Sequence, residues 1–337
     1  MNQIRLGIVG CGGMSRSHAR GLGNLADRLT VAATVDIDEE RAQKAAELFP
    51  GAKAATDYRT VLDDVDALLL VLPHHLHHPI AKDCLEAGKH VLLEKPMANS
   101  EEECLDLIET AEKVDRVLMI AYCMRYHPVV VRMKQLIDER AFGDLFQMSI
   151  WTEQLTMYPP DHWASKAATL GGGQLFSHGC HYIDLLLWFM GRPVRGVHVG
   201  TNFGTPWMER EGTSNVCIEF ENGALGYHFG TWGSRGTRLS KSMHLHCTEG
   251  MLEMSHDRSK LILHKGGKET VLMEIQPGKH TENEMAHFIE CITTGRRPLT
   301  DGPGSLQGLR VIWRLYEAEQ KGKMADLTGL GLDQFGS

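Results

Sequence analysis

The stretch Ile4-Arg5-Leu6-Gly7-Ile8-Val9-Gly10-Cys11-Gly12-Gly13-Met14-Ser15 decides the fold of this chain. It begins with an apolar run typical of a buried strand, and residues 14–27 continue it with a helical pattern. Gly10 permits a tight turn, and Gly12 lets a pyrophosphate approach the backbone at the helix start. Gly-x-Gly-x-x-Ser between a strand and a helix predicts a dinucleotide site. The expected cofactor-binding residues of this turn are Gly10, Gly12, Gly13 and Met14.

A second apolar run ends at Asp36, 21 residues after Ser15. A carboxylate at this place can accept hydrogen bonds from both ribose hydroxyls of adenosine and would repel a 2′-phosphate. The sequence therefore favours NAD over NADP. The alternative is that Asp36 is an ordinary cap for the helix that follows, which starts with Glu39 and Glu40.

Strands and helices alternate along the first 121 residues. Strands this apolar are covered on both faces, which predicts a parallel sheet with helices on each side. We expect an α/β Rossmann domain with a doubly wound sheet over residues 1–121. The expected strands are 4–10, 29–36, 67–72, 90–94 and 117–121, and the expected helices are 14–27, 38–49, 80–87 and one capped by Ser100 with Glu103.

Residues 122–337 have a different pattern, that of an α+β domain with a large, mostly antiparallel open sheet. Asn222-Gly223 between two strand patterns predicts a hairpin with a type I′ turn. An open sheet face often forms contacts between subunits, so we expect a homodimer or homotetramer. The expected strands are 144–154, 216–221, 224–232, 242–247, 261–263 and 271–275, and the helices 129–140, 174–190, 282–293 and 308–320.

Composition narrows the choice of partners. The 337 residues carry a net charge of −8, which argues against nucleic acid as the main partner. We expect no membrane span, because no apolar run is long enough, and no signal peptide, because the N-terminus begins with a strand pattern. None of the eight cysteines forms a Cys-x-x-Cys pair, so reduced thiols and a cytoplasmic protein are expected.

Lys95 is the first candidate for chemistry. It follows the strand pattern of residues 90–94 in Gly88-Lys89-His90-Val91-Leu92-Leu93-Glu94-Lys95-Pro96. Ligands of open α/β sheets bind at the carboxyl ends of the strands. A half-buried lysine beside a cofactor can lower its pKa and transfer protons. The alternative is a solvated lysine at a strand end.

His181 is the second candidate. It lies in Ser177-His178-Gly179-Cys180-His181-Tyr182-Ile183-Asp184, which starts the helix after Gly171-Gly172-Gly173. Residues four apart on an α-helix share a face, so Ser177 and His181 are expected to point the same way. A histidine held by polar neighbours at a glycine-rich entrance can act as a general base. The alternative is a buried histidine bonded to backbone.

Two further segments contain side chains of the kinds that bind metals or small molecules. His74-His75-x-His77-His78 suggests a metal, but zinc requires three or four convergent ligands, usually with a carboxylate or thiolate, and we expect none here. Aromatic rings with polar rims suit a small-molecule pocket, which makes four residues of the segment 158–166 candidates on the substrate side; structural aromatics in a long loop are the alternative. These candidates are Tyr158, His162, Trp163 and Lys166.

These motifs, in this order, resemble the glucose–fructose oxidoreductase / inositol dehydrogenase (Gfo/Idh/MocA) family over essentially the whole chain. The resemblance also uses Arg125-Tyr126-His127-Pro128. It implies an NAD-dependent oxidoreductase that transfers hydride between nicotinamide and a secondary hydroxyl of a sugar, inositol or related polyol. It implies Lys95 and His181 as catalytic residues and a cis Lys95–Pro96 bond. Cofactor contacts are implied for Pro73, His74, His77, Glu94 and Lys95, and substrate contacts for Lys95, Arg125, Tyr158, His162, Trp163, Ser177, His178 and His181.

The chain departs from the family pattern at three positions. Ser177 stands where the family commonly has an aspartate, and His74 and Cys123 stand where it has asparagines. A serine supplies no negative charge to make His181 more basic, so Asp184 could orient His181, or Lys95 could carry the proton alone. The resemblance also leaves open a redox-neutral enzyme that cleaves glycosides with retained NAD. Ser177 leaves open a non-catalytic NAD-binding regulator.

Overall fold

The computed structural model describes residues 3–332, which divide into two compact units. Unit 1 comprises Met1–Tyr126 and Lys279–Ser305, and unit 2 comprises His127–Gly278 and Leu306–Ser337, within the described residues. This division departs from the single boundary expected after residue 121. The reason is α8 (Thr281–Thr294), whose apolar face completes the core of unit 1 with Met285, Phe288 and Ile289.

The sheet of unit 1 is parallel throughout and has the order β3-β2-β1-β4-β5-β6. The order reverses between β1 and β4, which is the switch point where doubly wound sheets bind ligands. The expected Rossmann domain is therefore confirmed; β3 is the strand that sequence analysis missed. The strands are β1 (Ile4–Val9), β2 (Leu29–Val35), β3 (Lys53–Ala55), β4 (Ala67–Leu70), β5 (His90–Leu93) and β6 (Leu118–Ile120).

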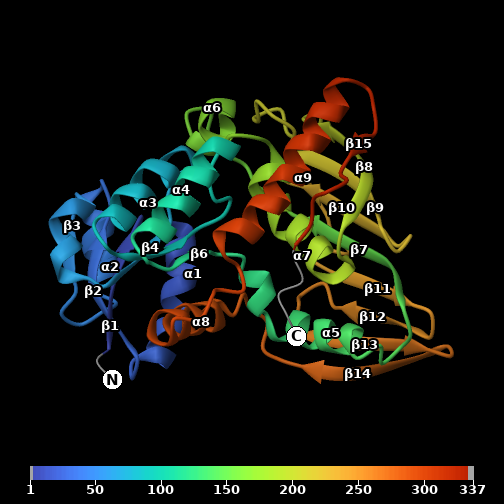
Figure 1. Ribbon diagram of the computed structural model, residues 1–337, viewed down its shortest axis with the longest axis horizontal. Coiled ribbons are helices and arrows are strands. Elements are labelled where there is room, and N and C mark those ends of the chain that lie inside the picture. Colours follow the sequence, from blue (N-terminus) through green and yellow to red (C-terminus); the bar gives the residue numbers. More distant parts are fainter. Residues whose placement is uncertain (1–2, 333–337) are drawn as a thin grey trace. The chain divides into compact units, whose positions relative to one another are not determined.

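Helices of unit 1 pack in pairs, α1 with α8 and α3 with α4 (Figure 1). Ser100 caps α4 as predicted, since its Oγ accepts a hydrogen bond from the Glu103 amide at 3.2 Å. Burial of β4 and β5 between helix layers explains why their sequences are apolar without alternation. The helices are α1 (Gly13–Leu22), α2 (Glu39–Ala46), α3 (His77–Glu86), α4 (Glu101–Lys113) and α8.

The sheet of unit 2 has the order β14-β13-β12-β11-β7-β10-β9-β8-β15. Among the described strands, β7 and β10 are parallel and the other neighbours are antiparallel, which confirms a mostly antiparallel sheet. The strands are β7 (Leu145–Glu153), β8 (Pro193–Thr201), β9 (Thr213–Phe220), β10 (Leu225–Thr231), β11 (Met243–Cys247), β12 (Gly250–Met254), β13 (Lys260–Lys265), β14 (Lys268–Glu274) and β15 (Ala325–Asp326).

One hairpin differs from its prediction. Of Asn222 and Gly223, the glycine alone has a positive φ, 80°, so the β9–β10 turn is not type I′, which requires positive φ at both central residues. Instead the Asn222 side chain accepts a hydrogen bond from the Ala224 amide at 3.0 Å. The β13–β14 hairpin has positive φ at both Gly266 and Gly267, as the type I′ geometry demands.

Helices cover one face of the unit 2 sheet and leave the other open. α7 (Cys180–Met190) packs on β7 and β10, and α5 (Pro128–Asp138) packs on β12 and β13. The expected helix 174–190 is divided, because Leu175–Gly179 forms a π-helix before α7. The other helices are α6 (Ala167–Leu170) and α9 (Gly302–Gln320). Within residues 3–332, no helix is long and apolar enough to cross a membrane.

Candidate active site

The glycine turn after β1 has the form that a dinucleotide requires. Gly10 has a φ of 91°, and a Cβ there would lie 2.1 Å from the carbonyl oxygen of Val71 on the neighbouring strand end. Gly12 caps α1, and a Cβ there would have no neighbour within 4 Å. The open space at Gly12 and the free amides of the α1 N-terminus can hold a pyrophosphate.

Asp36 is fixed by two backbone amides. Its Oδ2 accepts from Cys11 at 2.8 Å, and its Oδ1 accepts from Asp38 at 3.0 Å. The first bond ties the end of β2 to the glycine turn. Asp38, not Asp36, caps α2, so the capping alternative for Asp36 is wrong. Beside it Ile37, an apolar side chain that was not among the predicted site residues, is 95% exposed to water.

Lys95 is not a solvated lysine at a strand end. Its side chain is only 19% exposed, and its Nζ lies 4.0 Å from Glu94 Oε2. The same Glu94 oxygen accepts a hydrogen bond from the Lys95 amide at 3.2 Å. The Lys95–Pro96 peptide bond is cis, as the family resemblance implied. Lys95 therefore sits directly after β5, at the carboxyl edge of the sheet, with a carboxylate beside its amine.

A buried histidine holds that carboxylate. His18 on α1 is 1% exposed, and its Nε2 lies 2.8 Å from Glu94 Oε1. Burial by itself would raise the pKa of Glu94, but the hydrogen bond from His18 and the charge of Lys95 lower it to about 2. Glu94 was expected to contact the cofactor. Its surroundings show an anion shared between His18 and Lys95.

A second carboxyl lies in the same part of unit 1. Glu284 on α8 is fully buried, and neither of its carboxyl oxygens has a hydrogen-bond partner among the described residues. Burial and the charge of Glu94 raise its pKa well above the ordinary value. Neither His18 nor Glu284 was predicted from the sequence, because nothing in the local pattern links α1 or α8 to the end of β5.

The histidines after β4 have separate partners. The ring of His77 is fully buried, with Nδ1 2.7 Å from the Pro96 carbonyl and Nε2 2.9 Å from the Leu72 carbonyl. His77 thus braces the Lys95–Pro96 segment and does not reach a ligand. His78 pairs with Asp106 at 2.6 Å, and His74 is 4% exposed after Pro73. Within residues 3–332, no cluster of three or more metal-ligating side chains is present.

His181 of unit 2 begins the second group of candidate residues. It is 7% exposed on the first turn of α7, after the π-helix that carries Ser177 and His178. π-helical turns are rare and recur at functional sites. The π-turn also removes the basis for placing Ser177 and His181 on one face, since that spacing holds for an α-helix. Asp184 is buried one turn further along α7.

Behind His181 lies a buried polar layer that sequence analysis missed. Tyr182 stacks on His228 of β10 with ring centroids 5.1 Å apart, and His228 Nε2 lies 3.1 Å from Thr152 Oγ1. Burial, with His198 nearby, lowers the pKa of His228 to about 3, so this ring is neutral. The His178 ring meets Tyr182 edge-on at 5.4 Å.

The triple glycine is required by packing. Gly171 has a φ of 83°, and a Cβ on Gly172 would lie 2.4 Å from the Phe176 Cβ. A Cβ on Gly173 would lie 2.1 Å from the Glu211 carboxylate, which also accepts a hydrogen bond from Tyr316. The glycine-rich entrance is therefore a tightly packed start to the π-helix.

The predicted substrate-side aromatics form one small cluster in unit 2. Tyr158 and His162 stack at 4.8 Å, and Trp163 packs against the buried side chains of Met208 and Trp232. The nearby Lys166 forms a 3.0 Å ion pair with Glu209. Arg125 belongs to unit 1, where it is 4% exposed and donates to the Leu299 carbonyl at 3.4 Å. Substrate contacts by these residues remain predictions.

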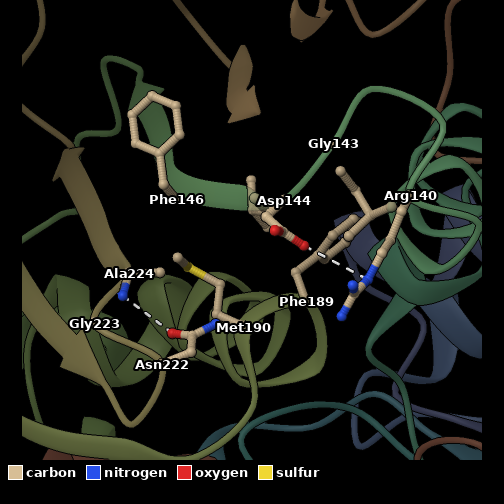
Figure 2. A pocket seen from close by; sticks show the side chains of 11 residues that line it. Arg140, Gly143, Asp144, Phe146, Phe189, Met190, Asn222, Gly223 and Ala224 are labelled. Carbon is tan, nitrogen blue, oxygen red and sulfur yellow. Dashed lines mark hydrogen bonds and ion pairs between the residues drawn. The ribbon is translucent and has the colours of Figure 1, made fainter. Parts of the chain in front are cut away.

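A cavity of about 480 Å³ lies elsewhere on unit 2, between the ends of β7, α7 and the β9–β10 hairpin (Figure 2). Phe146, Phe189 and Met190 line it, and its charged members, Arg140 and Asp144, form an ion pair at 3.5 Å. It contains none of the predicted catalytic residues, so we do not assign the chemistry to it.

Comparison with known proteins places these features in a family. A model described as "Oxidoreductase family, NAD-binding Rossmann fold" matches residues 4–122, and the "GFO/IDH/MocA C-terminal domain" matches residues 130–253. Inositol 2-dehydrogenase 2 of Saccharopolyspora erythraea is 30% identical over 227 residues, 66% of this chain and 65% of that protein. D-xylose 1-dehydrogenase [NADP(+)] of Haloarcula marismortui is 26% identical over 95% of this chain and 92% of its own length.

A solved structure supports the same assignment. The aldose–aldose oxidoreductase from Caulobacter crescentus, complexed with glycerol, superposes with a TM-score of 0.87 and 26% identity, covering 97% of this chain and all of that chain. The match extends over both units. The sequence-based expectation of an NAD-binding oxidoreductase is thereby confirmed: the chain belongs to the Gfo/Idh/MocA family of oxidoreductases.

Proposed function

We propose that this protein is an NAD-dependent dehydrogenase that oxidises a secondary hydroxyl of a sugar, inositol or related polyol, or reduces the corresponding ketone. One observation carries the proposal: Lys95 is held 4.0 Å from a buried carboxylate at the carboxyl edge of a Rossmann sheet. A lysine in such a place can bind a hydroxyl as the ammonium and accept the hydroxyl proton in its neutral amine form. The named relatives, which act on inositol, xylose and aldoses, support the substrate class.

The residues present suit the cofactor. The open cradle at Gly12 and the α1 N-terminus would hold the pyrophosphate, and Asp36 would hold the adenosine ribose. When bound, the nicotinamide supplies the acceptor for hydride. We assign to Lys95 the binding and deprotonation of the reacting hydroxyl. His181, partly screened from water on α7, is the second candidate for that proton.

We also propose that the enzyme is a cytoplasmic homo-oligomer that associates through the open sheet face of unit 2. All eight cysteines are free thiols, which suits a reducing compartment. The open face carries a patch of exposed or half-buried apolar side chains that strand register places together, the kind of patch that marks interaction sites. Its members include Val197, Val199, Leu225, Tyr227 and Trp151.

A substrate panel tests the function. The purified protein is incubated with inositols, aldoses, sugar acids and glycosides, each with NAD⁺ or NADP⁺, and the nicotinamide absorbance is followed. We expect reduction of NAD⁺ with at least one polyol or sugar. Glycoside cleavage without net NADH would instead show a redox-neutral enzyme. Cofactor binding without turnover of any compound would indicate a regulator.

A further inference from the structure

Unit 1 contains two buried glutamates with opposite surroundings. Glu94 accepts from His18 at 2.8 Å and lies 4.0 Å from the Lys95 amine, whereas Glu284 has no hydrogen-bond partner for either carboxyl oxygen among the described residues. A buried carboxylate without a donor is strongly disfavoured, while a carboxylate with a donor and a nearby cation is stabilised. The surroundings therefore assign the negative charge to Glu94 and leave Glu284 as a neutral acid.

The surroundings of Glu94 and Glu284 differ because His18 contacts Glu94. His18 is 1% exposed, it comes from α1, and it contacts the Glu94 oxygen that faces away from Lys95. With Oε1 held by His18, Oε2 is left to accept from the Lys95 amide and to face the Lys95 amine.

We propose that His18 is a positioning residue for the reaction: by donating to Glu94, it fixes that carboxylate as the anion that faces Lys95, while Glu284 remains uncharged. The proposal rests on the proposed function only in that Lys95 is taken as the group that handles the proton. A fixed anion beside Lys95 favours the ammonium form, so removal of this anion must make Lys95 lose its proton at lower pH.

Other charged or titratable groups act on the same carboxyls. Lys279, whose amine lies 3.0 Å from Met14 Sδ, lowers the pKa of both Glu94 and Glu284. His77 lies on the side of Lys95 and Pro96, and burial lowers its pKa, so its ring is neutral near pH 7. Tyr126 faces Glu284, and burial raises the pKa of its phenol well above the ordinary value. With a lowered pKa for His77 and a raised pKa for Tyr126, neither group is charged near pH 7, so neither takes the place of the Glu94 anion there.

The test measures the titration of Lys95 without relying on turnover. The full-length protein is labelled with trace acetic anhydride from pH 6 to 11, and acetylation of Lys95 is quantified by mass spectrometry. We expect the labelling midpoint of Glu94→Gln to fall by about one to three pH units relative to wild type. His18→Phe should move the midpoint in the same direction, and His18→Gln, which keeps an N–H donor, should restore it toward wild type.

Glu284→Gln is the matched control. Glutamine reproduces the shape of a neutral acid, so the labelling midpoint should stay at the wild-type value. An unchanged midpoint in Glu94→Gln, or an equal shift in Glu284→Gln, would overturn the proposal. Should His18→Phe not fold, as judged by circular dichroism, His18→Asn takes its place, because its shorter amide does not reach the Glu94 carboxylate. A wild-type midpoint in that variant would reject the positioning role of His18.

The labelling experiment and the proposed function can fail independently of each other. A Lys95 variant with normal turnover would remove Lys95 from catalysis, yet the labelling midpoints would still report whether His18 and Glu94 control its proton. Conversely, the Lys95 variant could be inactive while the labelling midpoint of Lys95 stays unchanged in the Glu94 and His18 variants. That result would keep the proposed function and reject the positioning role.

Discussion

A Cβ atom on Gly10 would lie 2.1 Å from the carbonyl oxygen of Val71, so the glycine turn and the end of β4 touch through bare backbone. The φ of 91° at Gly10 is also one that other residues rarely adopt. We expect Gly10→Ala to lower the free energy of unfolding by more than about 2 kcal/mol, since strain and a backbone clash add. Urea unfolding of the variant measures this.

Gly12→Ala is the matched case, because a Cβ there meets nothing within 4 Å. Its stability should remain within about 0.5 kcal/mol of wild type. If the pyrophosphate lies against Gly12, the added methyl group should weaken NADH binding by at least about tenfold, or about 1.4 kcal/mol. A fluorescence titration with NADH checks the point, and wild-type affinity in Gly12→Ala would count against this placement of the cofactor.

Asp36 provides a prediction about cofactor choice. Asp36→Asn keeps an oxygen acceptor for one of the two backbone amides but removes the charge that repels a 2′-phosphate. The ratio of kcat/KM for NAD⁺ to that for NADP⁺ should fall by at least about tenfold. Asp38→Asn, in the cap of α2 two residues away, should leave the ratio unchanged. An unaltered ratio in Asp36→Asn would remove Asp36 from the ribose site.

The sequence was sufficient to predict the Rossmann sheet, because its signals are local. Apolar strands, the glycine turn and the Ser100 cap each act within a few residues, and each is present in the structure. The short strand β3 lacks an apolar pattern, since its residues are exposed or half-buried. The π-helix before α7 was not predicted, and its start has a tertiary partner: the Leu175 amide donates to the Glu211 carboxylate, which is distant in sequence.

The supporting residues of the site were harder to predict than its motif residues. Lys95 and His181 stand in recognisable motifs. The roles of the other three residues depend on tertiary surroundings that no local sequence pattern reports; these residues are His18, Glu284 and His228. His77 shows the reverse case. Its motif suggested a cofactor contact, but the ring is fully buried. Its nitrogens lie 2.7 and 2.9 Å from two backbone carbonyl oxygens, and the neutral ring can donate to one of them.

Lys95→Met tests the assigned acid–base residue. Methionine keeps much of the buried aliphatic stem but cannot accept a proton, so kcat should fall by at least about a hundredfold. Lys89→Met is a fitting control, since it lies at the other end of the same strand and bonds the Val65 carbonyl at 3.1 Å. Single-turnover rates should drop in the first variant only. Near-normal turnover in Lys95→Met would leave His181 as the remaining candidate.

The open sheet face predicts how the protein associates. Leu225 is 45% exposed and lies on that face, so Leu225→Glu should place a charge in the proposed contact and shift the protein toward monomer in sedimentation velocity. Leu105, 38% exposed on α4 of unit 1, offers a control with similar exposure. A variant Leu225→Glu with the wild-type sedimentation coefficient would place the contact elsewhere.

The neutral His228 makes stability depend on pH. Its pKa is about 3 in the folded protein, below the ordinary value of 6.5, so below pH 6.5 the unfolded chain binds a proton that the folded chain does not. Stability must therefore fall as the pH drops from 6.5 toward 3. His228→Gln removes this proton uptake on unfolding. The free energy of unfolding of the variant should therefore fall less than that of wild type between pH 6.5 and 5, by about 2 kcal/mol. Urea unfolding at several pH values measures the change of the free energy of unfolding with pH, with the exposed His256→Gln as control. Equal slopes in wild type and His228→Gln would mean that folding leaves the pKa of His228 unchanged.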